Sequence, residues 1–324
     1  MHDVLKKVSE IGIVPVIKID DAEKAVPLAK ALADGGIPCA EITFRTAQGE
    51  EAIRRVSAEM PEVLVGAGTV TTTEQVDKAI AAGAKFVVSP GFNPKVVAYC
   101  IEKSITITPG CSSPSDIEQA ISFGLDVVKF FPAEQAGGLE YIKAVSAPYP
   151  GIKFMPTGGI NASNICKYLA FDKIIACGGS WMVGADLIES GNFAEITRLS
   201  KQAVQTIMGF ELAHIGMNTE SDAEAREAAK MFELLFGFGV HKDNDKSIWA
   251  GDNIEVMKLP LRGKHGHIAI GTSNVPRAKA YLERTIGMTF IPGTEKISDK
   301  GELTFIYLDK EIAGFAVHLI KIVK

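Results

Sequence analysis

The chain has 324 residues, of which 47% are hydrophobic and 23% charged, and its formal net charge at pH 7 is -5. This composition is typical of a soluble globular protein, and the dispersed basic residues give no sign of a nucleic-acid surface. No apolar stretch approaches the roughly 18 residues that cross a bilayer, and residues 1–7 lack the apolar core of a signal peptide. We therefore expect a cytoplasmic protein of one large domain or two ordinary ones.

Residues 1–208 alternate short apolar runs with segments of helical period, which is typical of repeated β-α units around a parallel sheet. The eight candidate strands are Ile13–Ile17, Cys39–Phe44, Val63–Gly66, Phe86–Ser89, Thr106–Thr108, Val127–Phe130, Phe154–Thr157 and Ile174–Cys177. The amphipathic segments between them include Ala22–Ala33, Glu50–Glu59, Thr73–Ala82 and Pro114–Phe123. Eight such units in about 200 residues predict a closed (β/α)8 TIM barrel, with a doubly wound open sheet as the alternative.

The cysteines of the chain are odd in number and form no C-x-x-C pair. They lie mostly in apolar runs, at Cys39, Cys100, Cys111, Cys166 and Cys177. We expect buried thiols rather than disulfides or zinc ligands.

Polar residues follow the predicted strands at the end where barrels carry function. Along the second strand, alternation puts Glu41, Thr43 and Arg45 on one side, where they offer a proton-transfer group and a cation. The competing interpretation is a surface ion pair between Glu41 and Arg45, which would contribute little stability.

Lys129 lies at the end of an apolar run, between Val128 and the aromatic pair Phe130 and Phe131. Such surroundings disfavour charge and would lower the pKa of the lysine, which would make it an amine nucleophile for carbonyl carbon. The alternative is a lysine that extends its ammonium group into solvent.

Glycine pairs follow the last two predicted strands, at Gly158-Gly159 and at Gly178-Gly179-Ser180. Barrels commonly build a phosphate site in these two units from backbone N–H groups and helix N-termini. Two such turns in neighbouring units favour phosphate binding over a purely local role.

Six segments in order resemble the signatures of bacterial aldolases that act on 2-keto-3-deoxy-6-phosphogluconate (KDPG) and 4-hydroxy-2-oxoglutarate (KHG). These segments, which cover about residues 3 to 207, are Glu41–Arg45, Gly66–Val70, Ser89–Gly91, Val128–Glu134, Pro156–Ile160 and Gly178–Trp181. The resemblance implies a class I aldolase that cleaves KDPG to pyruvate and glyceraldehyde 3-phosphate, or KHG to pyruvate and glyoxylate. It also implies a homotrimer in carbohydrate metabolism, in the Entner–Doudoroff pathway.

The resemblance assigns roles to individual residues. Lys129 would form the Schiff base and Glu41 would be the general acid/base, with no cofactor. The remaining substrate contacts would be Arg45, Thr69 and Thr157 for the carboxylate, Gly158, Gly159, Gly179 and Ser180 for the phosphate, and Pro90 and Phe131 for packing.

The pattern changes after about residue 208, and we expect a second domain over residues 209–324. Within it, Ala213–Thr219 recurs as Gly266–Thr272, and each copy leads into an amphipathic helix that ends near a glycine, Gly237 or Gly287. Duplicated β-α-β-β-β modules resemble the vicinal-oxygen-chelate superfamily, which includes glyoxalase I and extradiol dioxygenases.

In that superfamily the first and last strands of each module offer metal ligands, and the matching positions here are His214, Glu255, His267 and His318. Three imidazoles and a carboxylate suit a divalent transition metal with an open position. The alternative is a cavity lined by hydrogen-bonded histidines without metal. His318 departs from the carboxylate that is common in glyoxalase-like members, so an enzyme, a metal-dependent sensor and an oligomerisation module all stay open.

Two other functions compete with the aldolase. One is a barrel that binds a sugar-acid phosphate as a sensor, without using an amine. The other assigns the main activity to a glyoxalase- or dioxygenase-like metal domain at residues 209–324, with the barrel as scaffold.

Overall fold

The computed structural model describes residues 2–322. The chain divides into two compact units, Met1–Ile207 and Met208–Lys324, which we call unit 1 and unit 2. None of the described helices is long and apolar enough to cross a membrane.

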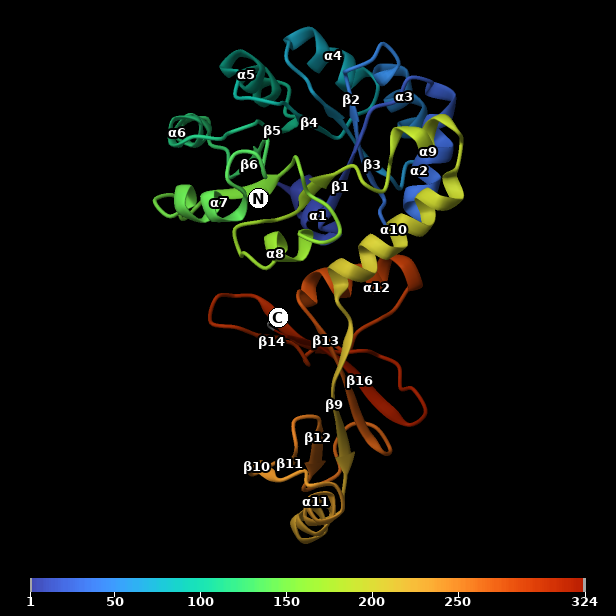
Figure 1. Cartoon of the computed structure of the whole chain (residues 1–324), viewed down its shortest axis with the longest axis vertical. Coiled ribbons are helices and arrows are strands. Elements are labelled where there is room, and N and C mark those ends of the chain that lie inside the picture. Colours follow the sequence, from blue (N-terminus) through green and yellow to red (C-terminus); the bar gives the residue numbers. More distant parts are fainter. Residues whose placement is uncertain (1, 323–324) are drawn as a thin grey trace. The chain divides into compact units, whose positions relative to one another are not determined.

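Unit 1 is built on eight parallel strands that follow one another in chain order (Figure 1). They are β1 (Ile13–Ile17), β2 (Cys39–Thr43), β3 (Leu64–Gly68), β4 (Phe86–Val88), β5 (Thr106–Thr108), β6 (Val127–Phe130), β7 (Lys153–Pro156) and β8 (Cys177–Gly179). Pairing runs from β8 through β1 to β5, and β6 pairs with β7. Single parallel bridges join Gly110 to Lys129 and Thr157 to Gly178, so β6 and β7 lie between β5 and β8. Unit 1 therefore holds a curled, all-parallel sheet.

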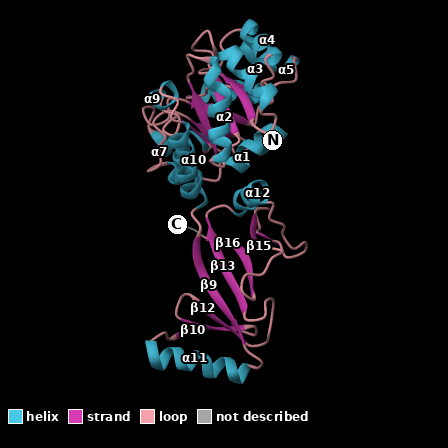
Figure 2. Ribbon diagram, turned by 90° about the vertical axis from the view of Figure 1, so that its right-hand side faces the viewer, coloured by secondary structure: helices cyan, strands magenta, loops and turns pink. Residues whose placement is uncertain are grey.

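Helices lie between and around these strands (Figure 2). They are α1 (Asp3–Ile11), the 3-10 turn η1 (Ala22–Lys24), α2 (Ala25–Asp34), α3 (Gly49–Glu59), α4 (Thr73–Ala81), α5 (Pro94–Glu102), α6 (Pro114–Ser122), α7 (Gly138–Ser146), α8 (Ile165–Leu169), α9 (Ala185–Glu189) and α10 (Phe193–Met208). Local sequence fixes several starts. Thr72 with Gln75 forms a capping box at α4, and Ser113 with Asp116 forms one at α6.

Seven of the eight predicted strands of unit 1 are confirmed within two residues. The bounds predicted for the eighth, Ile174–Cys177, are wrong. Ile174 makes only a bridge to Phe154, whereas Gly178 and Gly179 are strand residues rather than a turn. A Cβ on Gly178 would collide with the Thr157 side chain, so this glycine provides space and not a bend.

Four of the five cysteines are buried, and Cys166 is exposed. No disulfide joins the described cysteines. The expectation of buried thiols is confirmed except at Cys166.

Unit 2 contains one mostly antiparallel sheet of eight strands with two helices (Figure 1). The first half comprises β9 (Glu211–Asn218), α11 (Asp222–Phe236), β10 (Val240–Asp243), β11 (Ser247–Ala250) and β12 (Ile254–Met257). The second half comprises β13 (Gly266–Thr272), α12 (Val275–Ile286), β14 (Lys296–Ile297), β15 (Leu303–Tyr307) and β16 (Phe315–Lys321). Both helices end at left-handed glycines, Gly237 and Gly287, as the sequence predicts.

The sheet of unit 2 is symmetric in its strand order, β10-β11-β12-β9-β13-β16-β15-β14. The two repeated strands β9 and β13 pair antiparallel at its centre, and each is flanked on its outer side by a parallel strand of its own half. The two halves are therefore duplicated β-α-β-β-β modules joined edge to edge.

Helix α11 covers one face of the first module. Ala225 and Ala229 pack against Ile248, Ala250 and Val256. Because side chains alternate along a strand, the residues between these positions, including Trp249 and Glu255, lie on the opposite face. That opposite face is the one on which the predicted metal ligands stand.

Candidate active site and candidate metal centre

Lys129 on β6 and Glu41 on β2 meet inside unit 1. Their side chains are 7% and 0% exposed, and Lys129 Nζ lies 3.4 Å from Glu41 Oε1. Both elements are short apolar strands whose other residues are also buried, so neither polar group can turn to solvent. The solvent-extended alternative for Lys129 and the surface ion pair for Glu41 do not describe these positions.

Glu41 occupies space that a glycine leaves open. A Cβ on Gly68, in the neighbouring strand β3, would overlap the Glu41 carboxyl group. The second carboxylate oxygen, Oε2, is buried and has no hydrogen-bond partner within residues 2–322. An unsatisfied buried oxygen beside an amine is free to take a proton from a bound molecule.

Arg45 is positioned by Thr43. The Thr43 hydroxyl donates to the carbonyl of Ile17 at 2.8 Å and accepts from Arg45 Nε at 3.3 Å. Since β1 and β2 pair in parallel, this connection fixes the guanidinium at the carboxyl ends of both strands. Sequence alternation identified Thr43 only as a neighbour on the same side, not as the link to β1.

Two threonines predicted for the substrate stand at strand ends. Thr69, directly after β3, has a φ of 59°, an unusual conformation for a β-branched residue. Thr157, directly after β7, is 6% exposed, and its hydroxyl has no partner in the described part of the chain. Both features point to groups whose partner is a bound molecule.

The segment after Lys129 folds over the end of β7. The backbone N–H of Ala133 donates to the backbone carbonyl of Thr157 at 2.8 Å, and that of Glu134 donates to the backbone carbonyl of Gly158 at 3.1 Å. The side chain of Glu134 accepts a hydrogen bond from Tyr168, and a Cβ on Gly159 would collide with Glu134. Glu134 and Tyr168 were missed as supports, because their partners lie far away in sequence.

Aromatic packing closes the lysine from another side. Lys129 Nζ lies 5.5 Å from the centroid of the Phe131 ring, which is 40% exposed. The partly exposed Phe131 ring therefore lies beside the buried amine.

The glycines predicted for phosphate stand at neighbouring strand ends, because Thr157 bridges Gly178. Gly158 and Gly159 have φ of 101° and 77°, conformations that favour glycine, and Gly179 faces the Trp181 ring. Ser180 is exposed directly after β8. The helices that follow, α8 (Ile165–Leu169) and α9 (Ala185–Glu189), have only five residues each.

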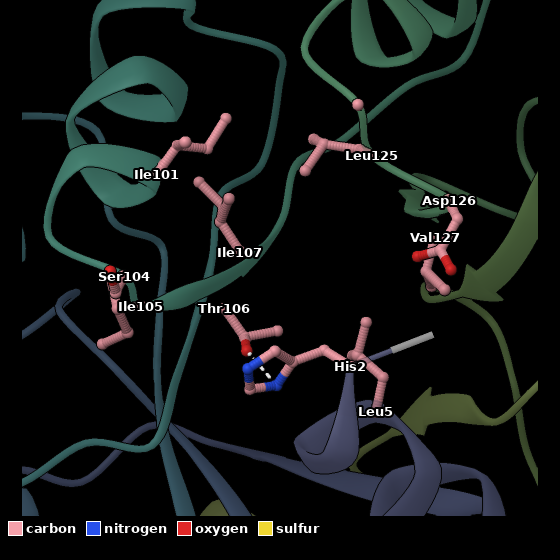
Figure 3. A pocket seen from close by; sticks show the side chains of 11 residues that line it. His2, Leu5, Ile101, Ser104, Ile105, Thr106, Ile107, Leu125, Asp126 and Val127 are labelled. Carbon is pink, nitrogen blue, oxygen red and sulfur yellow. Dashed lines mark hydrogen bonds between the residues drawn. The ribbon is translucent and has the colours of Figure 1, made fainter.

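Pro90 lies in a cavity of about 260 Å³ at the ends of β3 and β4, with Val70, Ser89 and Gly91. A second cavity, of about 420 Å³, lies at the starts of β5 and β6 (Figure 3). In it the His2 ring and the Thr106 hydroxyl are hydrogen-bonded at 2.8 Å. This cavity is at the opposite ends of the strands from the lysine amine, so it is not the reaction site.

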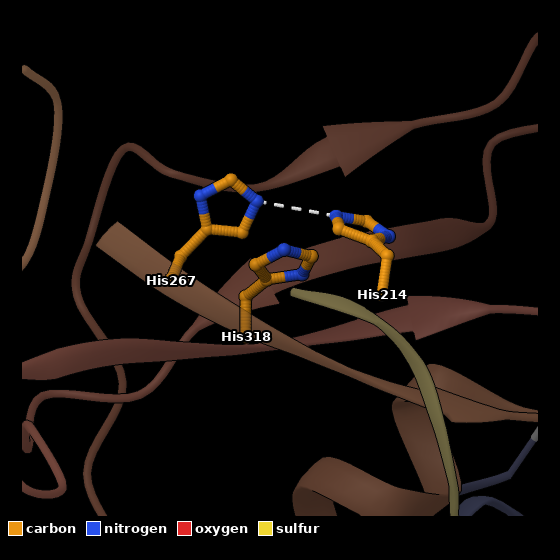
Figure 4. Close-up of side chains that lie close together, drawn as sticks. All are labelled: His214, His267 and His318. Atoms are coloured by element: carbon orange, nitrogen blue, oxygen red, sulfur yellow. Dashed lines mark hydrogen bonds between the residues drawn. The ribbon is translucent and has the colours of Figure 1, made fainter. Parts of the chain in front are cut away.

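In unit 2, His214, His267 and His318 converge on one point (Figure 4). One ring nitrogen from each lies within 4.8 Å of the others, and His214 Nε2 is 3.1 Å from His267 Nε2. Glu255 Oε2 is 3.5 Å from His214 Nε2 and 3.2 Å from His267 Nε2. All four predicted ligands are therefore brought together.

These separations fit a metal. Ligand atoms about 2.1 Å from one ion lie about 3.0 Å apart at right angles and about 3.4 Å apart in a tetrahedron. The observed values of 3.1 and 3.2 Å fall in this range, and the third, 3.5 Å between Glu255 and His214, lies just above it. His267 is hydrogen-bonded through Nε2, whereas Nδ1 of both His267 and His318 lacks a hydrogen-bond partner among the described residues.

Burial keeps His214 and His318 neutral, which is the form that binds metal. Desolvation lowers the pKa of His214 to about 4 and that of His318 to about 3. Burial raises the pKa of Glu255, but hydrogen bonds from His267 and Ser247 outweigh it and lower the pKa to about 2. Ser247, which is 1% exposed, donates to Glu255 Oε1 at 2.6 Å and orients the carboxylate. Ser247 was not predicted as a site residue, because a single serine in a strand carries no pattern of its own.

Another glycine makes room in this cluster. Gly216 on β9 pairs with His267 on β13, and a Cβ at Gly216 would overlap the imidazole ring. The ring therefore lies directly over the backbone of the neighbouring strand.

Comparison with known proteins finds similarity over unit 1. A family model described as KDPG and KHG aldolase matches residues 4–199. A 2-dehydro-3-deoxy-phosphogluconate aldolase of Treponema pallidum is 48% identical over 207 residues, which are 64% of this chain and 99% of that protein.

Two solved structures are similar as well. The KDPG aldolase of Legionella pneumophila, with pyruvate captured as a covalent carbinolamine intermediate, is 38% identical with a TM-score of 0.60, covering 61% of this chain and 97% of that one. The KDPG aldolase of Zymomonas mobilis with 3-phosphoglycerate is 37% identical with a TM-score of 0.58, covering 62% and 94%. The matched family model ends before unit 2 begins.

Proposed function

Because the chain belongs to the KDPG and KHG aldolase family and is a lyase, we propose that unit 1 is a closed (β/α)8 barrel that cleaves KDPG, KHG or both through a Schiff base. The observation that carries this proposal is the buried contact of 3.4 Å between Lys129 Nζ and Glu41 Oε1. Pyruvate bound covalently in the Legionella pneumophila relative supports the same chemistry here.

The proposed reaction begins at the amine. Neutral Lys129 attacks the C2 carbonyl carbon, and the carbinolamine loses water to give an iminium. Glu41 then accepts the proton of the C4 hydroxyl, the C3–C4 bond breaks, and its electron pair moves to the iminium nitrogen to form an enamine. The aldehyde leaves, C3 is protonated, and water releases pyruvate and restores the amine.

The other side chains position the substrate in this proposal. Arg45, held by Thr43, faces the carboxylate with two parallel N–H donors, while the hydroxyl groups of Thr69 and Thr157 complete its hydrogen bonds. Phe131 and Pro90 exclude water from the reacting carbons. Because the carboxylate is held in place, the neighbouring keto carbon is oriented for attack by the Lys129 amine.

Phosphate binding at Gly158, Gly159, Gly179 and Ser180 would favour KDPG over KHG. The phosphorylated ligand in the Zymomonas mobilis relative supports such a site. Ser180→Asp should raise the KM for KDPG more than the KM for KHG, because a carboxylate repels phosphate. An equal change for both substrates would remove Ser180 from the phosphate site.

Kinetics on KDPG and KHG, with the full-length protein, test the main proposal. A barrel that only senses a sugar-acid phosphate would turn over neither substrate. Its mass would also stay unchanged after incubation with pyruvate and borohydride, whereas an aldolase chain gains one reduced adduct.

We further propose that unit 2 is a vicinal-oxygen-chelate-like domain that holds one divalent transition metal through His214, Glu255, His267 and His318. The convergence of four ligand-capable side chains from two matched modules supports this second function. Such a metal could polarise an oxygen of a bound ligand. Metal analysis of the purified protein tests it.

The assembly and location of the protein remain predictions. A homotrimer should give three times the chain mass in light scattering, and a monomer mass would refute it. The cytoplasmic location is tested by fractionation of cells.

A further inference from the structure

The cluster in unit 2 stands in a continuous row across one face of the sheet. In register, Lys242 pairs with Trp249, Trp249 with Glu255, Glu255 with Gly216, and Gly216 with His267. A second row pairs His214 with Ala269, Ala269 with His318, and His318 with Tyr307. Since directly paired residues share a face, all of these side chains lie on the side of the sheet away from α11.

Aromatic rings surround the cluster on this face. The Trp249 ring lies 4.9 Å from His214, between ring centroids. On the other side, the rings of Phe305 and Tyr307 lie 4.3 and 5.0 Å from His318. We call Trp249, Phe305 and Tyr307 the aromatic collar.

Each ring of the aromatic collar carries a cation. The distances to the ring centroids are 5.5 Å for Lys242 Nζ over Trp249, 4.3 Å for Lys296 Nζ over Phe305 and 5.5 Å for the Arg262 guanidinium carbon over Tyr307. Each cation therefore contacts a ring that also contacts a histidine of the cluster.

These three cations have no carboxylate of their own. Lys242, Arg262 and Lys296 are exposed, and none makes an ion pair with a residue in the described range. Elsewhere in unit 2, Arg226, Lys258 and Lys321 do pair with acidic side chains. The positive charges at the aromatic collar are thus not paired with carboxylates, whereas these other cations of unit 2 are.

The proposed metal ion and the indole N–H of Trp249 also favour binding of an anion. A divalent ion with one carboxylate and three neutral imidazoles keeps one net positive charge. Trp249 Nε1 is a buried donor without a hydrogen-bond partner inside residues 2–322, and it stands beside His214. An oxygen atom with negative charge would satisfy both the ion and the indole N–H.

We infer that this face of unit 2 binds a small carboxylate anion, with an oxygen atom on the metal and its charge among Lys242, Arg262 and Lys296. This inference rests on the metal centre proposed above. Pyruvate has this chemistry, and the aldol cleavage proposed for unit 1 releases it, so it is the first probe.

The experiment uses the full-length Lys129→Ala protein, which removes the amine that would bind pyruvate in unit 1. After loading with Co²⁺, the visible absorption of the metal is followed during titration with pyruvate and, separately, with the uncharged pyruvamide. We expect a saturable spectral change with pyruvate and a much weaker response to the amide.

Arg262→Ala and Lys296→Ala should each raise the Kd of pyruvate about three- to tenfold, because an exposed cation contributes modestly. Arg262→Lys should restore part of the affinity. Lys230→Ala is the matched control, because Lys230 is an exposed lysine on α11, against the opposite face. It should leave the Kd unchanged.

The outcomes separate the two proposals. If Co²⁺ does not bind, the metal centre is wrong and this inference falls with it. If Co²⁺ binds but pyruvate changes nothing, or if the collar variants match Lys230→Ala, the metal centre stands and the carboxylate site is refuted.

Discussion

Glu41 and Lys129 are 88 residues apart in sequence, yet the carboxyl oxygen of one and the amine of the other lie 3.4 Å apart in a buried space. The parallel pairing of the strands creates this contact, since β2 and β6 present their carboxyl ends to the same end of the curled sheet. The first three predictions follow from it.

Lys129 is expected to be the only lysine that forms an imine. After incubation with pyruvate and borohydride, peptide mapping should find one adduct at Lys129, and Lys129→Ala should gain none. Lys18→Ala is the matched control, since Lys18 is exposed after β1 and paired with Asp20 at 2.7 Å. An adduct on Lys18 or any other lysine would contradict the assignment.

Glu41→Gln should form the imine but lose carbon–carbon cleavage by roughly 10²–10⁴-fold in kcat, because the amide keeps the shape and cannot accept the proton. Single-turnover trapping and steady-state kinetics measure the two steps separately. Near-normal turnover in this variant would end the role of Glu41 as acid/base.

Gly68→Ala should impair the aldolase without any change to Lys129 or Glu41. The new methyl group overlaps the carboxyl group of Glu41, which must move, and overpacking costs about 1–3 kcal/mol. We expect kcat to fall at least tenfold and Tm to drop. Gly151→Ala, at a glycine with open space around it, should change neither, and equal behaviour of the two variants would refute the argument.

Unit 2 should contain metal that unit 1 does not need. Metal analysis should find about one divalent ion per chain in the wild type and none in His214→Ala/His267→Ala. The control is His241→Ala/His265→Ala, which changes two exposed histidines of the same unit. Chelation should leave the aldolase rate unchanged, because the iminium formed by Lys129 is the electron sink. Loss of the aldolase rate together with the metal would contradict the assignment of the two functions to separate units.

The metal-free cluster should make unit 2 sensitive to acid. The folded pKa values of about 4 for His214 and about 3 for His318 lie below the unfolded value of 6.5. Between pH 6.5 and about 4 the unfolded chain therefore binds more protons, so the free energy of unfolding falls as pH falls. At about 1.4 kcal/mol per unit of pKa, the loss should reach a few kcal/mol.

Thermal unfolding of the chelated protein, followed by Trp249 fluorescence in a Trp181→Phe background, measures this sensitivity. His214→Gln/His318→Gln should flatten the dependence above pH 4. A wild-type stability that does not change between pH 7 and 4 would contradict the pKa values.

The sequence predicts the periodic parts of this protein well. Strands such as Val127–Phe130 and helices such as Pro114–Ser122 are set by local patterns of apolar residues and caps. The eighth strand fails because glycine has low strand propensity, whereas Gly178 lies against Thr157 of the neighbouring strand end and Gly179 against the ring of Trp181, two residues later.

Site residues were predictable where a strand end or a repeat exposed them. Lys129 follows an apolar run, and His214 and His267 hold the same place in two copies of one segment. Supporting residues such as Ser247 and Tyr168 could not be found this way, because their partners Glu255 and Glu134 are chosen by tertiary packing. The cations of the aromatic collar were missed for the same reason.

Because the two modules of unit 2 are paired in matched register, each module supplies two of the four proposed metal ligands. His214 and Glu255 belong to the first module, and His267 and His318 to the second, and the strands that pair between the two modules are β9 and β13. A metal ion bound to ligands from both modules would therefore stabilise the pairing of β9 with β13, because its binding free energy adds to the stability of unit 2. In the loaded protein, the amide hydrogens of β9 and β13 should then be the slowest in unit 2 to exchange with solvent.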